Sequence, residues 1–240
     1  MPTFVTYNTG GLVPRREQQI QFLARNILRA GADVVCLQEV GPDLDHFLGH
    51  HLQGQFAYVA RPPGNDPRDL NVAILSRQPF QQVRSHAQHR FELLDGSRLG
   101  RFSRDLLRVD LTLQGCHWSV YTTHLKSMRG GPSAHRQRES EAQAIVQLLG
   151  QQVSDHPWVL TGDLNDGRES AALQRLFGSP LLLCNSLDGT SRTLTFPCRK
   201  SRQQFDYVLF PASMRARLIS SKVWPESRAS DHAMVSATFA

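Results

Sequence analysis

Short polar segments follow apolar runs at several places along the chain, and this pattern limits the possible folds more than any other feature. Five segments are polar islands, and a sixth is a lone acid within an apolar stretch. They are Thr6–Asn8, Leu37–Glu39, Thr123–Ser127, Thr161–Asn165, Ser230–His232 and Phe205–Leu209. Folds of the α/β class place their binding and catalytic groups where strands end. The pattern therefore predicts that the fold gathers these side chains at one edge of its sheets.

The apolar runs themselves have the patterns of strands. Val34–Leu37 is continuously apolar, which is typical of a strand buried on both faces. Leu107–Leu113 alternates between apolar and polar residues and predicts a half-buried strand, with His117–Thr123 as its hairpin partner across the Gln114–Gly115 turn. Further strands are expected at Phe4–Tyr7, Asn71–Leu75, Trp158–Thr161, Phe205–Phe210 and Met234–Phe239.

Helical periodicity separates several of these strands. Pro14 suits the first turn of a helix, apolar residues recur at helical spacing from Ile20 to Leu28, and Gly31 provides a stop. Two further helices are expected, one that ends at Gly150 and one from a Ser170 cap to Gly178. Because hairpins interrupt the alternation of strands and helices, the pattern predicts two packed mixed sheets with helices outside.

The length and charge of the chain set limits on its organisation and partners. In 240 residues no linker rich in proline, glycine or serine divides the chain. The polar islands come from both halves, so residues 1–240 are predicted to form a single domain. A net charge of +6 favours an anionic partner, such as nucleic acid or a phosphorylated surface, although charge also serves solubility.

The cysteines and the N-terminus bear on the compartment. Neither a zinc site nor a disulfide scaffold is indicated, since no Cys-x-x-Cys occurs among Cys36, Cys116, Cys184 and Cys198. Cys36 and Cys184 lie in apolar runs and are predicted to be buried free thiols. Met1–Val5 lacks the pattern of a signal peptide, and no stretch approaches the ~20 apolar residues of a membrane span. A monomeric, reduced cytoplasmic protein is expected.

Each polar island alone has an ordinary explanation as a turn or a solvated strand end. Their order along the chain is more specific. It resembles the endonuclease/exonuclease/phosphatase, or DNase I-like, superfamily at Asn8, Gln38–Glu39, His124, Gly162–Asn165, Asp206 and Ser230–His232. The resemblance spans residues 6 to 232. It implies a four-layer α/β sandwich of two mixed β-sheets flanked by helices, with the site at one end between the sheets.

The acids and amides of these motifs include oxygen donors for a hard cation. Mg²⁺ and Mn²⁺ prefer oxygen ligands in octahedral geometry and keep several waters. Glu39 is the best candidate ligand, with Asn8 and Asp231 near the same ion, and the resemblance implies that Glu39 is the principal one. Such an ion would polarise a phosphoryl oxygen and neutralise developing charge.

The resemblance also implies roles for the catalytic residues. Asp163 would orient and deprotonate the attacking water, while Asn165 holds that water or a phosphoryl oxygen. His232 would stabilise the pentacoordinate state as an imidazolium, with Asp206 bonded to its other ring nitrogen. His124 would be a second phosphate contact or the acid for the leaving group.

Several cations are candidate substrate contacts, and each has a plainer alternative. Arg104 opens a strand where DNase I-like enzymes carry a phosphate-contacting arginine, but it is equally explained as a surface residue. Asn71 either lines the site or only starts a strand. The cations after His124 fit a nucleic-acid backbone, although a solvated helix face is the commoner meaning of such a run. They are Lys126, Arg129, Arg136 and Arg138.

Departures from branches of the superfamily narrow the substrate. Abasic-site endonucleases carry a Tyr-centred motif where this chain has Thr123–Ser127, and inositol-phosphate 5-phosphatases carry Cys-Asp-Arg near Phe205–Tyr207. The aromatic hairpins of secreted sphingomyelinases have no counterpart. His124–Ser127 is similar to the motif of tyrosyl-DNA phosphodiesterases and DNase-like bacterial members.

The sequence thus favours a metal-dependent, DNase-like nuclease that hydrolyses DNA phosphodiester bonds by in-line attack of water. Two alternatives remain open. One is a phosphatase or phosphodiesterase that acts on a small-molecule, phosphotyrosyl-DNA or lipid-headgroup phosphoester. The other is a catalytically silent binding module.

Overall fold

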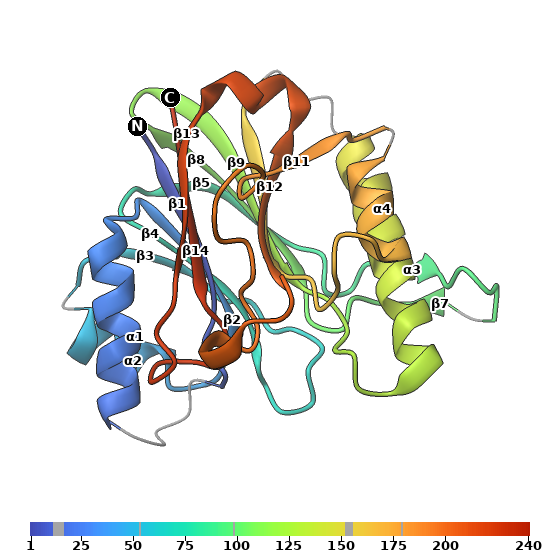
Figure 1. The fold of residues 1–240 in the computed structure, drawn as a ribbon, viewed down its shortest axis with the longest axis horizontal. Coiled ribbons are helices and arrows are strands. Elements are labelled where there is room, and N and C mark those ends of the chain that lie inside the picture. Colours follow the sequence, from blue (N-terminus) through green and yellow to red (C-terminus); the bar gives the residue numbers. More distant parts are fainter. Residues whose placement is uncertain (12–16, 53, 98, 152–155, 179) are drawn as a thin grey trace.

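Two six-stranded mixed β-sheets pack face to face and carry helices on their outer faces (Figure 1). The structure is a computed structural model that describes residues 1–11, 17–52, 54–97, 99–151, 156–178 and 180–240. Pro14, predicted to open the first helix, lies outside the described residues. The helices are α1 (Glu17–Ala30), α2 (Leu44–His51), α3 (Gly131–Gly150) and α4 (Ala171–Phe177), with short 3₁₀ turns at η1 (Cys198–Lys200) and η2 (Ala212–Arg217).

The first sheet has the strand order β13-β14-β1-β2-β4-β3. Its strands are β1 (Thr3–Asn8), β2 (Val34–Val40), β3 (Tyr58–Ala60), β4 (Asn71–Ser76), β13 (Leu218–Trp224) and β14 (Met234–Phe239). β1 pairs in parallel with β2 and antiparallel with β14. Helices α1 and α2 cover the outer face of this sheet (Figure 1).

The second sheet has the strand order β11-β12-β10-β9-β8-β5. Its strands are β5 (Phe80–Ser85), β8 (Leu106–Leu113), β9 (Cys116–His124), β10 (Trp158–Asp163), β11 (Leu183–Asn185) and β12 (Asp206–Pro211), and a separate two-stranded ribbon joins β6 (Phe91–Glu92) to β7 (Leu99–Gly100). Helices α3 and α4 lie on its outer face, so the layers follow the predicted four-layer sandwich.

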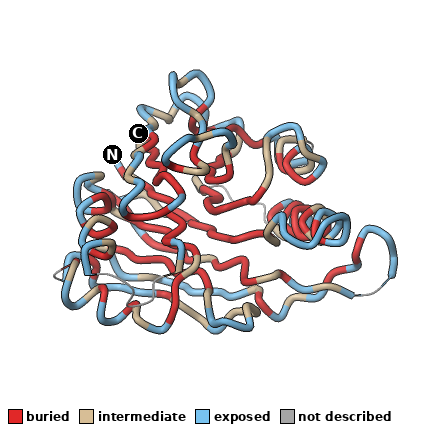
Figure 2. Tube along the Cα trace, turned by 60° about the horizontal axis from the view of Figure 1, so that its bottom comes forward, coloured by how far each residue is buried: buried red, intermediate tan, exposed pale blue. Residues whose placement is uncertain are grey.

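The main core lies between the two sheets. Phe4 of β1 and Trp118 of β9 are fully buried there, with ring centroids 4.8 Å apart. A second core joins α1 to the first sheet through residues such as Leu23 and Ile27, and a third joins α3 to the second sheet. Figure 2 shows buried segments in the interior of the molecule and exposed segments around it. The three cores account for the four layers.

Local sequence signals set several boundaries as predicted. Gly31 follows α1 with φ +62°, a conformation that costs glycine little. Gln114 and Gly115 both have positive φ, as a tight hairpin turn between β8 and β9 requires. The Ser170 side chain caps α4 by accepting a hydrogen bond from the Leu173 amide. Turn and cap chemistry is local, so the sequence alone specifies it.

Two expectations differ from the structure. β8 is more than half-buried, because Asp110 on its polar face is covered and pairs with Arg108 at 2.8 Å. The edge strands β3, β5, β11 and β13, the ribbon strands β6 and β7, and helix α2 were not expected. The residues of β5 are mostly exposed, and neither β5 nor β13 has an apolar alternation. Cys36 and Cys184 are buried free thiols, as predicted. None of the described helices is long and apolar enough to cross a membrane.

Candidate active site

Strand pairing brings the polar islands together at one end of the sandwich. In the first sheet, Asn8 at the end of β1 lies beside Gln38 of β2. In the second sheet, Asp163 at the end of β10 lies beside His124 of β9 on one side and Asp206 of β12 on the other. The parallel β1–β2 and β9–β10 pairs explain this gathering, because parallel strands present their carboxyl ends at the same edge.

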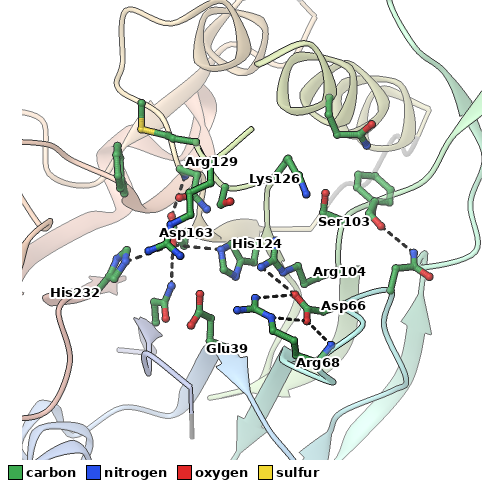
Figure 3. A pocket seen from close by; sticks show the side chains of 18 of the residues that line it. Glu39, Asp66, Arg68, Ser103, Arg104, His124, Lys126, Arg129, Asp163 and His232 are labelled. Carbon is green, nitrogen blue, oxygen red and sulfur yellow. Dashed lines mark hydrogen bonds and ion pairs between the residues drawn. The ribbon is translucent and has the colours of Figure 1, made fainter. Parts of the chain in front are cut away.

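Asp163 is the hub that connects the two sheets. Its Oδ2 atom accepts a hydrogen bond of 2.8 Å from Nδ2 of Asn8, which belongs to the other sheet. The Nε2 atoms of His124 and His232 lie 3.5 Å and 3.7 Å from the same oxygen. All four side chains are buried (Figure 3). The carboxylate is therefore held at a fixed point between two imidazoles and an amide.

His232 and Asp206 form a buried ion pair behind this hub. Nδ1 of His232 lies 2.9 Å from Oδ2 of Asp206, and the Ser230 hydroxyl accepts a hydrogen bond from the His232 backbone amide. Burial by itself would lower the pKa of His232, but the charges of Asp206 and Asp163 overcome it and raise the pKa to about 10. The imidazole is thus protonated at neutral pH.

The pKa values of Asp163 and His124 are shifted mainly by burial. Burial raises the pKa of Asp163 to about 7, although the charge of His232 acts in the opposite direction. Burial and the nearby charge of Arg104 hold the pKa of His124 well below its usual value. At neutral pH the site therefore contains a cationic His232, a neutral His124 and a carboxyl group near its point of titration. This last property suits a group that takes up a proton.

Glu39 reaches the site through an irregularity in β2. The pairing of β2 with β4 shifts between Leu37 and Val40, and Glu39 has φ +56°. Positive φ is uncommon in non-glycine residues and often marks functional positions. The side chain points into the cavity, and none of the described residues forms a hydrogen bond to its carboxylate (Figure 3).

Asn165 occupies a second unusual conformation, with φ +51°, two residues after Asp163. Its amide nitrogen donates to Oδ1 of Asp163 at 2.9 Å, and its side-chain Nδ2 donates to the carbonyl of Leu125 at 3.0 Å. The Asp-x-Asn turn is therefore built around the Asp163 carboxylate. It also fixes the loop that follows His124.

These groups open into a cavity of about 1000 Å³. Asn8, Glu39, Asp231, His124, Asp163, Asn165, His232, Arg104, Lys126 and Arg129 line it, as predicted for a common site. Asp206 is not in the lining, in keeping with its place behind His232. Phe196 packs against His232 with ring centroids 4.7 Å apart and closes one wall.

Three predicted substrate contacts do not line the cavity. Asn71 is buried and donates to Asp69 at 2.7 Å. Arg136 is half exposed and pairs with Asp95 at 3.2 Å. Arg138 is fully buried, so the prediction that it contacts substrate phosphate is wrong. Its guanidinium instead donates to the Asp166 carboxylate at 3.0 Å and to the carbonyls of Lys126 and Ser127.

Arg104 belongs to a charged cluster that the sequence did not reveal. Arg104 and Arg68 both pair with Oδ2 of Asp66 at 3.1 Å, and all three side chains line the cavity (Figure 3). Partial burial would raise the pKa of Asp66, but hydrogen bonds from Arg68 and the charge of Arg104 lower it. The loop that carries Asp66 and Arg68 has no recognisable motif, so only the tertiary fold places it at the site.

A buried glutamate on α3 holds two walls of the cavity together. The carboxylate of Glu141 accepts hydrogen bonds from the amide and hydroxyl of Ser103 at 2.7 Å and 2.6 Å, and from the amide of Lys126 at 2.8 Å. With Arg138 it binds the backbone of the loop after His124 from one side. These two α3 residues therefore position Lys126 and the segment that leads to Arg104.

The donor set fits a hard divalent cation. Glu39 and Asp231 are carboxylates on the cavity wall, and Asn8 lies beside them with its Oδ1 atom bonded to the Gly10 amide. Another group, Asp163, Asp206 and His232, has ligand atoms within 4.8 Å of one another, but Asp206 and His232 are bonded to each other. Oxygen ligands around Glu39 are the chemistry that Mg²⁺ or Mn²⁺ takes.

The fold and the site together are those of a hydrolase that acts on phosphoester bonds, and the comparisons with known proteins agree. The Endonuclease/Exonuclease/phosphatase family matches residues 5–232. The chain therefore belongs to this family, whose enzymes generally depend on divalent metals. No curated protein sequence matched the chain.

Several solved structures share the fold across the whole chain. The catalytic domain of human Nocturnin, solved with a bound sulfate anion, has a TM-score of 0.79 and 19% identity, over 100% of this chain and 93% of that one. A humanized D. rerio TDP2 has a TM-score of 0.75 and 18% identity, over 100% and 98%. A family protein from Leptotrichia buccalis has a TM-score of 0.75 and 15% identity, over 100% of both chains.

Proposed function

We propose that residues 1–240 form one catalytic domain that hydrolyses phosphodiester bonds of nucleic acid, DNA foremost, with Mg²⁺ or Mn²⁺ as cofactor. The observation that carries the proposal is the convergence of His124 and His232 on the Oδ2 atom of Asp163 inside a cavity faced by Glu39. This arrangement offers a proton acceptor, a fixed cation and a metal ligand around one point.

In this proposal Asp163 orients the attacking water and takes its proton. The pKa of about 7 keeps part of the carboxyl population ionised at neutral pH and still basic enough to accept a proton. Asn165 is held next to Asp163 by its backbone hydrogen bond, and it contacts the water or a phosphoryl oxygen. Both residues belong to one rigid turn, so the water is placed before the reaction begins.

His232 stabilises the negative charge that develops on the phosphoryl group. Asp206 keeps the ring oriented and charged, as an orienting carboxylate does in hydrolase triads. His124, held neutral, donates a hydrogen bond to a phosphoryl oxygen or to the leaving group. Because the site is buried, these interactions act in a medium of low dielectric, where they are stronger than in water.

Glu39 would be the principal ligand of the divalent cation, with Asp231 and Asn8 beside it. The ion would neutralise charge on the phosphoryl oxygens and on the leaving oxygen. None of the described residues donates a hydrogen bond to the Glu39 carboxylate. This supports the role of a metal ligand, since a carboxylate that faces a cavity is normally paired with a donor or a cation.

The walls of the cavity favour a polyanionic substrate. Arg68, Arg104, Lys126 and Arg129 line it beside the catalytic groups (Figure 3). The chain also carries a net charge of +6. One of the structures with the same fold, from D. rerio TDP2, was solved with a single-strand DNA product. A small phosphoester would need fewer of these cations, which makes it the second candidate.

A substrate panel tests the proposal. Plasmid DNA, single-stranded DNA, RNA, a 5′-phosphotyrosyl oligonucleotide and small phosphoesters would each be incubated with Mg²⁺, Mn²⁺ or EDTA. We expect metal-dependent cleavage of a nucleic acid that exceeds turnover of the small esters. Turnover of small esters alone would move the assignment to the second candidate, and no turnover by the wild type with either metal would favour a binding module.

A further inference from the structure

A group of cations outside the cavity is arranged on aromatic rings. Phe22 of α1 is half-buried, and the guanidinium of Arg25 lies 5.5 Å from its ring centroid. The guanidinium of Arg228, from the segment between β13 and β14, lies 3.9 Å from the same centroid. One ring thus holds two cations from distant parts of the chain.

The same arrangement repeats further along α1. Trp224 at the end of β13 is half-buried, with the Lys222 ammonium 3.8 Å and the Arg29 guanidinium 6.0 Å from its ring centroid. Both groups include arginines of α1, and we call the two groups together the basic strip. Its members are Phe22, Arg25, Arg29, Lys222, Trp224 and Arg228.

The basic strip carries an excess of positive charge. Arg228 is neutralised by Glu226, whose carboxylate lies 2.7 Å away. Within the described part of the chain, no carboxylate lies at ion-pair distance from Arg25, Arg29 or Lys222, and all three are exposed. Many other arginines of the protein, such as those of the Asp66 cluster, are paired. Glu226 also interacts with Arg25 through its charge, but one carboxylate does not balance the four cations of the strip, so the surface attracts a further anion.

The basic strip adjoins the active site. Phe22 and Arg228 line a hollow of about 360 Å³ together with Ser230 and Asp231. Asp231 also lines the main cavity. Figure 1 shows α1 beside the strands β13 and β14, and β13 is an edge strand of the first sheet. Asp231 therefore lies between the main cavity and the hollow next to the strip.

We infer that the basic strip binds the phosphodiester backbone of a nucleic-acid strand whose scissile phosphate occupies the cavity; the inference rests on the proposed function. An aromatic face holds a guanidinium in place, which reduces the rotamer freedom lost on binding, and leaves its outer N–H groups for phosphate oxygens. Arg25 and Arg29 are four residues apart on α1, which places them about 6 Å apart along the helix axis. The strip thus offers successive phosphate contacts.

The test compares strands of different length on one variant. Arg25→Gln with Arg29→Gln removes two cations and leaves the aromatic rings. Fluorescence anisotropy in EDTA would measure affinity for a long single strand and for a dinucleotide over a series of salt concentrations. For the long strand we expect weaker binding and a slope of log K against log salt that is shallower by about 0.7 for each lost contact. The dinucleotide, which fills only the cavity, should lose nothing.

Two further variants make the result specific. Arg84→Gln removes one exposed cation from β5, an edge strand of the second sheet that does not belong to the basic strip. This variant should have the same slope as the wild type. Arg25→Lys with Arg29→Lys keeps both positive charges and should keep most of the slope, even if the lysines pack less closely on the aromatic rings than the arginines do. An unchanged slope in the Gln variant, or an equal change in Arg84→Gln, would overturn the inference while metal-dependent cleavage by the wild type preserves the proposed function.

Discussion

Nδ1 of His232 lies 2.9 Å from the Asp206 carboxylate, and both side chains are buried. The two residues come from β12 in one sheet and from the segment before β14 in the other. Their contact therefore forms only when the two sheets pack together. Since His232 owes its positive charge largely to Asp206, the pair acts as one unit.

This unit predicts non-additive effects. His232→Ala should remove most phosphodiesterase activity. Asp206→Asn should lower it less, because the amide that replaces the carboxylate still orients the ring but no longer supports its charge. The double variant should be about as slow as His232→Ala alone. The measurement is kcat/KM for a small phosphodiester in all three variants. Fully additive losses would mean that Asp206 does not work through His232.

Substitution of Glu39 should change the metal dependence of activity. Glu39→Gln keeps the shape of the side chain but removes the negative charge, so the protein should need a higher concentration of Mg²⁺ and turn over much more slowly. Unfolding temperatures should change little, since none of the described residues hydrogen bonds to the carboxylate. Activity measured over a series of Mg²⁺ concentrations tests this prediction. A near wild-type rate at limiting Mg²⁺ would show that Glu39 is not a metal ligand.

The buried Glu141 should matter far more than its neighbour Glu139. Glu141→Ala leaves the part-buried amides of Ser103 and Lys126 without their acceptors, at a cost of at most about 1–3 kcal/mol for each. We expect lower stability to urea and a higher KM, because the cavity walls lose their common anchor. Glu139→Ala, which removes a half-exposed pair with Arg175, is the matched control and should change both quantities little. Equal effects of the two substitutions would contradict the positioning role.

The cations that follow His124 should differ in their effect on DNA binding, according to whether they line the cavity. Lys126→Gln and Arg129→Gln alter the cavity lining, so each should weaken DNA binding and flatten its dependence on salt by roughly 0.7–0.9 in slope. Arg136→Gln lies outside the lining, pairs with Asp95, and should keep the wild-type slope. The same binding measurements in EDTA provide the comparison. A change for Arg136→Gln as large as for Arg129→Gln would favour a diffuse effect of charge.

Asp105 predicts a pH dependence of stability. Burial raises the pKa of this carboxyl group from 3.8 to about 6, and its Oδ2 atom has no hydrogen-bond partner. The folded state then holds its proton more tightly than the unfolded state. Ionisation of Asp105 should therefore cost stability as the pH rises from about 4 through 6, by about 3 kcal/mol at most.

Asp105→Asn should remove this part of the pH dependence. The variant should gain stability relative to the wild type as the pH rises to 7, which urea unfolding at a series of pH values would measure. An identical pH profile for the two proteins would place the Asp105 titration in the ordinary range.

The sequence by itself determined the central strands, the turns and most of the polar residues that line the cavity. Apolar runs and turn residues specified the strands that end at Asn8, Val40, His124 and Asp163, because periodicity, capping and turn chemistry depend on neighbours along the chain. The order of the motifs identified the family. Edge strands such as β13 escaped prediction, since their exposed residues follow no apolar alternation.

Only the tertiary structure decided which polar side chains reach the cavity. Arg138 and Arg129 look alike in the sequence, but the packing of α3 buries one guanidinium completely and leaves the other on the cavity wall. Asp66 and Glu141 belong to no motif, and their roles arise from contacts with Arg104 and Lys126, which are distant along the chain. Burial and long-range pairing are properties of the packed sheets and helices, so the pattern of residues along the chain does not contain them.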